Sequence, residues 1–440
     1  MNFWSRVPSP ISRNSHHIMY NKVALKNGTR VILVPDSRTK AATVFVLYRV
    51  GSRYENKKYN GVSHFIEHMM FKGTKRRPNT ADISRELDAV GADYNAFTGK
   101  DFTGYYVKID SRHFDLALDM LHDMLYRSKF EDKELRQERK VIMEEIHMYH
   151  DNPMRRIEDL IEEVMFRGSS LGWDIAGDNE SMHAITRAAM LAYKNAYYTP
   201  ERTIVVAAGN IGERAQAQIE KLFGQAPKRR PAKDFARYAG KPDGLRMAIE
   251  YKEVDQIQLA LAFPSYSHTD KRLPALALLA NILGGTMSSR LFIRIRERLG
   301  LAYFVRAGLE PYEDTGSFMI RAGLTKARIE EAVTAICREL AKMRDGGVTA
   351  AELKRAKENL RGRLVLELED SSDLAGFFGR QELYTRKIKT PDEKFAEYEA
   401  VTAADIRAVA KDIIRKNRAS LALIGPFKDQ ERHFAKLVKL

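Results

Sequence analysis

The sequence has a single cysteine, Cys337, in its 440 residues. One thiol excludes an internal disulfide and is typical of proteins from a reducing compartment. No apolar run reaches the ~18 residues that a membrane span requires, and the N-terminus lacks the hydrophobic stretch of a secretory signal. The sequence therefore predicts a cytoplasmic protein with no membrane partner.

Acidic residues are absent before Asp36. Residues 1–19 contain arginines and serines but no acid, which resembles a mitochondrial presequence, so the mitochondrial matrix is the alternative compartment. Pro8 and Pro10 would interrupt an amphipathic helix there. We therefore expect residues 1–19 to form a short disordered leader.

Signals for nucleic-acid binding are also scarce, although the net charge is +15. The basic residues are spread along the chain among 58 acidic ones, and no zinc knuckle or RNA-recognition motif is present. We expect no nucleic-acid partner. A solvated basic surface, or a preference for acidic peptides, explains the charge.

The segment 61–74 contains the pattern His64-x-x-Glu67-His68. Its apolar residues recur at three- and four-residue steps, which predicts a helix with His64 and His68 one turn apart on one face. Two imidazoles placed in this way can bind one metal ion. Glu67 lies near the same face, where its carboxylate could accept a proton from water. The order His-x-x-Glu-His is the inverzincin signature.

A catalytic zinc has three protein ligands and an open position, so a third ligand is needed. The pattern from Asp132 to Tyr149 predicts a long helix that carries Glu138 and Glu145 on one face. Glu144 is the alternative third ligand, and periodicity alone does not exclude it.

The histidine pattern, followed 77 residues later by the last Glu of Glu-Arg-x-Val-Ile-x-Glu-Glu, resembles the M16 metallopeptidases. The resemblance covers about residues 20–427 and implies one Zn²⁺ per chain. It implies His64, His68 and Glu145 as ligands, Glu67 as general base and Glu138 as a supporting carboxylate. It also implies that Asn95, Ala96 and Phe97 form an edge strand to which the substrate peptide adds.

The chain contains two copies of one unit. Thr402 and Gly425 follow Thr186 and Gly209 at the same distance of 216 residues, within similar surroundings. The sequence predicts an α+β protein with a zinc-binding catalytic domain at 20–224, a linker at 225–244 and a second α+β domain at 245–440. Residues 273–286, the counterpart of the metal helix, contain no histidine or carboxylate, so the second copy cannot bind zinc in the same way.

A second M16-like segment follows at residues 287–303. In active members of that family an arginine and a tyrosine seven apart reach over the zinc site, and here they are Arg296 and Tyr303. A phenol can stabilise an oxyanion and a guanidinium can hold the peptide backbone. Without the resemblance, a basic surface helix followed by a strand would be the favoured interpretation of this segment.

Together these features predict a zinc metalloendopeptidase that hydrolyses peptides or unfolded segments. In large family members the zinc motif and the Arg/Tyr pair lie in opposite halves of a clam-like chamber. We therefore expect a homodimer, or a heterodimer with a related M16 subunit, in which the partner supplies Arg296 and Tyr303. The alternative is a non-catalytic peptide-binding or assembly subunit of a heterodimeric processing peptidase.

Overall fold

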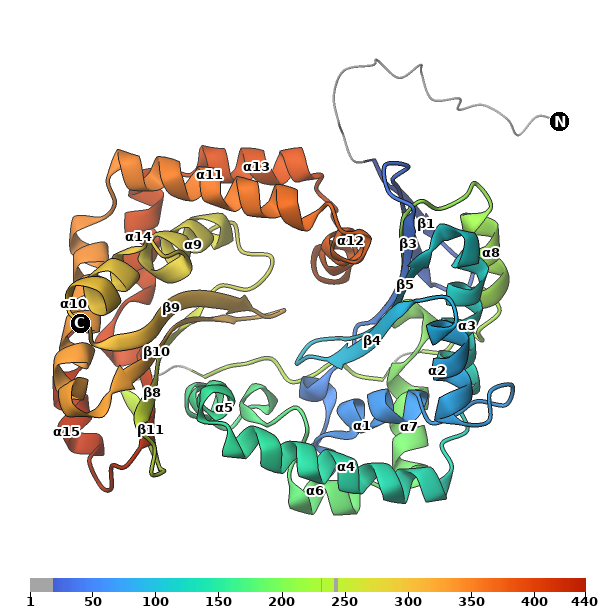
Figure 1. Ribbon diagram of the computed structural model, residues 1–440, viewed down its shortest axis with the longest axis horizontal. Helices are drawn as coiled ribbons and strands as arrows, with labels where there is room; N and C mark the ends of the chain where they lie inside the picture. Colours follow the sequence, from blue (N-terminus) through green and yellow to red (C-terminus); the bar gives the residue numbers. More distant parts are fainter. Residues whose placement is uncertain (1–18, 231, 241–243) are drawn as a thin grey trace.

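Two β-sheets form the centre of the molecule in this computed structural model, which describes residues 19–230, 232–240 and 244–440 (Figure 1). The first sheet has the strand order β1-β2-β6-β3-β5-β4 and the second β7-β11-β8-β10-β9. The strands are β1 (Asn21–Ala24), β2 (Arg30–Pro35), β3 (Ala41–Tyr48), β4 (Asp93–Thr98), β5 (Thr103–Asp110), β6 (Thr203–Gly209), β7 (Arg246–Tyr251), β8 (Gln256–Ser265), β9 (Ala302–Pro311), β10 (Gly316–Thr325) and β11 (Ser420–Gly425). The predicted leader, residues 1–19, lies outside the described residues except for Met19.

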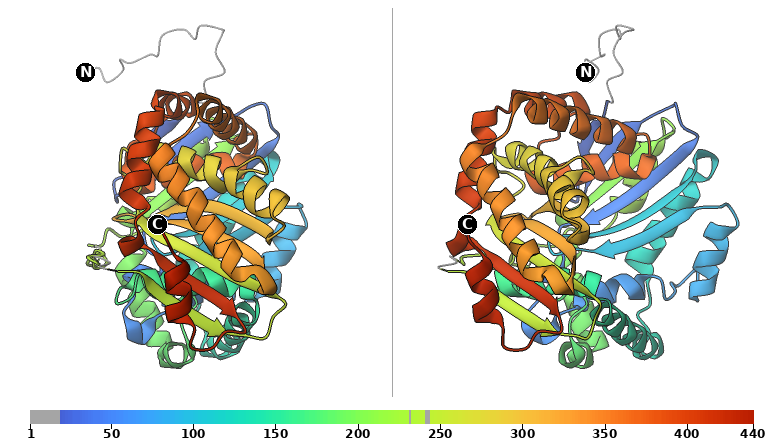
Figure 2. Two further views of the ribbon diagram at one scale, coloured as in Figure 1. Left: turned by 90° about the vertical axis from the view of Figure 1, so that its left-hand side faces the viewer. Right: turned by 60° about the vertical axis from the view of Figure 1, so that its left-hand side comes forward.

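The helices surround these sheets (Figure 2). Those of the first repeat are α1 (Val62–Met70), α2 (Thr80–Asp88), α3 (Phe114–Arg127), α4 (Asp132–Asp151), α5 (Pro153–Met165), α6 (Asn179–Ala184), α7 (Arg187–Tyr197) and α8 (Ala215–Phe223). Those of the second are α9 (Leu273–Ala280), α10 (Ile329–Gly346), α11 (Ala350–Glu367), α12 (Ser371–Thr385), α13 (Pro391–Ala400), α14 (Ala403–Ile413) and α15 (Glu431–Leu437).

The two halves share one topology. The order β2-β6-β3-β5-β4 recurs as β7-β11-β8-β10-β9, and the parallel pair, β2 with β6 or β7 with β11, occupies the same place in each sheet. Thr186 and Thr402 both cap their helices, α7 and α14, by accepting a backbone N–H, and Gly209 and Gly425 both end a strand. The predicted duplicated α+β fold is confirmed.

The two repeats exchange helices. One face of each sheet packs against helices of its own repeat, such as α3 on the first sheet and α14 on the second. The other face of the first sheet is covered by α12 of the second repeat, through Leu374, Phe378 and Leu383. Gly379 permits this packing, because a Cβ there would lie 2.6 Å from Leu47 Cδ1.

The exchange is reciprocal, because α5 of the first repeat covers the second sheet through Ile157, Leu160 and Ile161. Each repeat would otherwise expose an apolar sheet face to water. The predicted division of the chain at residues 225–244 remains a prediction, and it concerns the two repeats of the sequence. The packed layers do not follow this division, because they combine segments from both sides of it.

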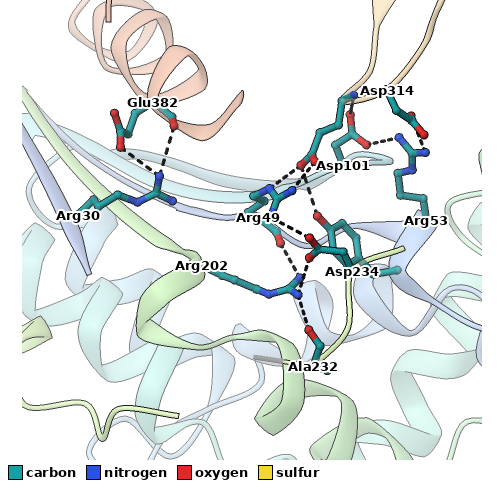
Figure 3. A network of polar contacts seen from close by, with 11 residues as sticks. Arg30, Arg49, Arg53, Asp101, Arg202, Ala232, Asp234, Asp314 and Glu382 are labelled. Atoms are coloured by element: carbon teal, nitrogen blue, oxygen red, sulfur yellow. Dashed lines mark hydrogen bonds and ion pairs between the residues drawn. The ribbon is translucent and has the colours of Figure 1, made fainter. Parts of the chain in front are cut away.

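Ion pairs join the two repeats as well (Figure 3). Arg53 donates to Asp101 at 2.9 Å and to Asp314, at the tip of the β9–β10 hairpin, at 2.8 Å. Arg49 binds Glu313 of the same tip, and Arg30 binds Glu382 of α12 at 3.1 Å. Within the described part of the predicted linker, Asp234 accepts from Arg202, and the Phe235 ring lies 3.6 Å from the Arg53 guanidinium. These two contacts hold this part of the linker against the first repeat.

Among the described residues, no helix is long and apolar enough to cross a membrane.

Candidate metal centre

Helix α1 carries the histidine motif and is fixed firmly at its start. Phe65, Ile66, Met69 and Met70 pack into the core of the first repeat, which turns His64 and His68 toward α4. The buried Glu55 carboxylate accepts from the backbone N–H groups of Gly61 and Ser63, at 2.6 and 2.8 Å. A carboxylate at a helix N-terminus satisfies free donors and complements the helix dipole.

Gly61 itself has a φ of +92°. A Cβ at this position would lie 2.4 Å from the Ala176 carbonyl oxygen, so the entry into α1 requires glycine.

Helix α4 brings Glu145 to the two histidines. The Nε2 atoms of His64 and His68 are 3.2 Å apart. Glu145 Oε2 lies 3.8 Å from His64 Nε2 and 3.5 Å from His68 Nε2. Tyr149, one turn later on α4, donates to the other oxygen, Oε1, at 2.8 Å. Within the described residues, these three side chains are the one group of histidine, cysteine and acidic residues able to hold a metal ion.

The protonation states of His64 and His68 leave a nitrogen lone pair on each ring for binding a metal ion. His68 Nδ1 lies 2.9 Å from Glu138 Oε1, so the proton belongs on Nδ1 and Nε2 keeps its lone pair. Lys72 binds the other Glu138 oxygen at 2.6 Å. Burial would raise the pKa of Glu138, but its hydrogen bonds to His68 and Lys72 outweigh burial and lower it. Burial, with His68 nearby, lowers the pKa of His64 to about 3, so this imidazole is neutral near pH 7.

These residues fit a tetrahedral zinc ion. Ligand atoms about 2.0 Å from zinc lie about 3.3 Å from one another in a tetrahedron, close to the separations just given. Two imidazole nitrogens and one carboxylate oxygen also form a known catalytic zinc ligand set.

Glu67 lies beside this group and is held by Thr98 of β4. Thr98 donates to Glu67 Oε2 at 2.6 Å. Glu67 Oε1 has no hydrogen-bond partner in the described part of the chain. Burial raises the pKa of Glu67 to about 6, and the Thr98 hydrogen bond opposes this shift. The carboxyl group therefore has one oxygen fixed and the other free to exchange a proton.

Glu144 points away from this centre. Its side chain is 82% exposed and lies near His147 on the outer side of α4. The structure thus brings Glu145, and not Glu144, to the histidines.

A cavity of about 960 Å³ opens in front of the centre. The predicted substrate strand, Asn95 to Phe97, lines it as part of β4, the edge of the first sheet. The edge strand of the second sheet, β9, lines it as well, together with Tyr384 of α12. The cavity therefore lies between the repeats and offers two unpaired strand edges.

This cavity is acidic although the protein is basic. Its walls carry eight carboxylates and four Lys or Arg side chains. Asp159 and Glu310 have no ion-pair partner among the described residues, and burial raises the pKa of each to about 7, with neighbouring carboxylates adding to the shift. A preference for acidic peptides, one of the two explanations of the net charge, does not suit these walls.

Arg296 and Tyr303 do not line this cavity. The Arg296 guanidinium lies 6.0 Å from the centre of the Tyr303 ring, and Tyr303 is 73% exposed. The structure thus brings these two residues together on the second repeat, apart from the metal centre of the same chain.

Sequence reasoning missed four supporting residues: Glu55, Lys72, Thr98 and Tyr149. Lys72 and Tyr149 follow His68 and Glu145 by one helical turn, a spacing that could have indicated contact. Glu55 and Thr98 lie on other segments, and no local pattern connects them to the motif.

Comparison with known proteins identifies the family of this chain. Residues 30–179 match the family model Insulinase (Peptidase family M16), and residues 184–360 match Peptidase M16 inactive domain. The chain is 36% identical to an uncharacterized zinc protease of Bacillus subtilis over 93% of this chain and 98% of the relative. It is 35% identical to one of Streptomyces coelicolor, over 93% and 90%.

Solved structures share the fold. A protease from Helicobacter pylori has a TM-score of 0.87 at 24% identity and covers 93% of this chain and 100% of its own. A structure titled as a peptidase M16 inactive domain from Pseudomonas fluorescens has a TM-score of 0.86 at 19% identity, over 93% and 98%. The matched models and the long relatives show that the chain belongs to the M16 peptidase family.

Proposed function

We propose that this protein is a zinc-dependent endopeptidase that hydrolyses peptides or unfolded segments. The proposal rests mainly on the convergence of His64, His68 and Glu145, whose ligand atoms lie within 4.8 Å of one another. Glu67 lies beside them with only one of its two carboxyl oxygens hydrogen-bonded. The relatives named as zinc proteases support the proposal.

His64 Nε2, His68 Nε2 and Glu145 Oε2 would hold the ion, one per chain, with Glu138 fixing the His68 tautomer. Zinc bound there supplies a Lewis acid and lowers the pKa of a coordinated water toward ~7. Glu67 accepts a proton from water at Oε1 while Thr98 holds Oε2, and it then donates that proton to the leaving amine. The substrate backbone extends the first sheet along Asn95, Ala96 and Phe97.

The acidic residues that line the cavity favour substrates that carry lysine or arginine. Asp159 and Glu310 come from different repeats, α5 and β9, and both lack a cation of their own among the described residues. An unpaired carboxylate in a partly buried site gains most from a cationic partner, because water screens the pair less there.

The partner subunit would complete the site. Arg296 and Tyr303 are exposed and lie outside the cavity, as expected of residues that act across a dimer interface. We therefore propose a homodimer, with a heterodimer containing a related M16 subunit as the alternative assembly. Cys337, the single and unpaired cysteine, supports a cytoplasmic location.

The Glu67→Gln variant tests the catalytic role. The amide keeps the size of the side chain but cannot accept the proton, so hydrolysis of a quenched peptide should fall by about 10²- to 10⁴-fold. Zinc content should remain one per chain, because Glu67 is not a ligand. Wild-type protein stripped by chelator and reloaded with zinc serves as the control. Undiminished turnover of Glu67→Gln would remove Glu67 from the mechanism.

A mixing experiment tests the shared site. Glu67→Gln and Tyr303→Phe proteins should each be inactive, but subunit exchange places one intact Glu67 opposite one intact Tyr303. Random exchange should restore about a quarter of wild-type activity. No recovery, despite exchange shown by differently tagged subunits, would argue against a shared site. If the wild-type protein itself cleaved no peptide, the non-catalytic alternative would be favoured.

A further inference from the structure

A second cavity, of about 570 Å³, lies on the second repeat. It is bounded by η7 (Phe292–Arg298), the C-terminal end of α10 and the loop that leads into α11. Helix α10 lies on the side of the second repeat away from the first (Figure 1). The two cavities share no lining residue, so this one is separate from the metal centre.

Its walls are basic. Arg290, Arg294 and Arg298 follow one another at intervals of four residues, and all three line the cavity. Lys342 joins them from α10, and Glu339 is the one acidic residue among the described lining residues.

Two of these cations are already neutralised. Arg290 forms a two-point contact with Glu352, at 2.7 and 2.8 Å, and donates to the Gly347 carbonyl oxygen at 2.9 Å. This contact lowers the pKa of Glu352 to about 2. Lys342 pairs with Glu339 at 2.7 Å. Arg290 therefore shapes the wall, and Lys342 brings little uncompensated charge.

Arg294 and Arg298 have no such partner. Neither makes an ion pair or side-chain hydrogen bond with any described residue. Like charges four residues apart on a helix repel each other. A multivalent anion between them would remove this repulsion.

Ser288 and the start of the 18-residue helix α11 line the same space. Thr349 is the N-cap of this helix, and its hydroxyl and backbone N–H already donate to Glu352 Oε2. The positive end of that helix dipole therefore points toward the cavity and favours negative charge. Guanidinium forks match phosphate oxygens in two-point contacts better than an ammonium group does.

We propose that this cavity binds a small phosphate-bearing molecule through Arg294 and Arg298. A volume of about 570 Å³ is in the range of small-molecule sites, which run from roughly 300 to 1,000 Å³. The shared chemistry is the phosphate group, supplied either by an inorganic phosphate or by a phosphate ester. The site does not depend on the proposed peptidase activity.

Calorimetric titration of the zinc-loaded full-length protein with inorganic pyrophosphate, and separately with glycerol phosphate, tests the proposal. We expect saturable binding that is about tenfold or more weaker in Arg294→Gln/Arg298→Gln, because a neutral amide cannot make the charge-assisted hydrogen bonds of a guanidinium group. The probe that binds with the higher affinity indicates whether the ligand is an inorganic phosphate or a phosphate ester. Arg294→Lys/Arg298→Lys keeps the positive charges but cannot make the two-point contacts of a guanidinium group, so it should retain part of the affinity.

The matched control is Arg338→Gln/Arg355→Gln, which removes two exposed arginines of α10 and α11 outside the cavity. It should bind like wild type. All variants keep the zinc ligands, so any phosphate bound at zinc contributes equally to each titration. Equal affinity in Arg294→Gln/Arg298→Gln and in the control Arg338→Gln/Arg355→Gln would overturn the proposal. Tight binding of an aspartate-rich peptide but not of pyrophosphate would overturn it as well. Thermal unfolding of each variant checks that it is folded.

Discussion

At the scale of single residues, the proposed metal centre includes a carboxylate that is not one of the three proposed ligands. Glu138 holds the His68 proton on Nδ1 and is itself held by Lys72. We expect Glu138→Gln to weaken zinc binding by about 10- to 100-fold, because the neutral amide fixes the tautomer less well and leaves Lys72 unpaired. Competition with a chromogenic chelator measures this effect.

Glu144→Gln is the matched control, since it removes the same charge from an 82% exposed position on the same helix. It should bind zinc like wild type. An equal loss in both variants would mean that the general charge of α4, and not the contact to His68, sets the affinity.

The residues of this centre were predictable to different degrees. His64 and His68 lie on one helical turn, so their proximity follows from local geometry. Glu145 and Glu144 are adjacent on α4, and periodicity could not choose between them. The choice depends on how α4 rotates against α1, which is decided by the burial of Leu135, Ile142 and Ile146.

At the scale of elements, the β9–β10 hairpin tip joins the second repeat to the first. Asp314 and Asp101 share the Arg53 guanidinium, and the Arg53 side chain is 0% exposed. Arg53→Met should lower the free energy of unfolding by about 3–5 kcal/mol, because it leaves two buried carboxylates without a cation. Denaturant titration measures the change.

Arg38→Met is the control for that substitution. It breaks the pair of Arg38, whose side chain is 61% exposed, with Asp36. Such a surface pair contributes about 0–1 kcal/mol. A similar small loss in Arg53→Met would show that the exchanged helices α5 and α12 and the remaining ion pairs, and not the contacts of Arg53, hold the repeats together.

At the scale of the whole molecule, the cavity between the repeats should make substrate selection depend on pH. The pKa values of Asp159 and Glu310 are raised to about 7, so both groups are mostly neutral at pH 6 and mostly charged at pH 8. The ratio of kcat/KM for an arginine peptide to that for its citrulline analogue should rise by about tenfold over this interval.

In the Asp159→Asn/Glu310→Gln variant the ratio of the two kcat/KM values should change little with pH, because the introduced amides do not titrate. A ratio that rises equally in wild type and in this variant would assign the pH effect to other groups of the cavity. The citrulline peptide corrects for changes in catalysis itself, since it differs from the arginine peptide in charge and not in length.

The sequence by itself determined what depends on local spacing and on repetition. The helical face of the histidine motif follows from the helical period, and the 216-residue repeat indicated two copies of one α+β unit, because equal folds keep equal intervals between their caps and strand ends. The tertiary structure decided the rest. The exchange of α5 and α12, the joining of Arg53 to Asp314 and the placing of β4 and β9 around one acidic cavity bring together residues from both repeats. Such contacts depend on how complete sheets bury their apolar faces, and no local pattern records them.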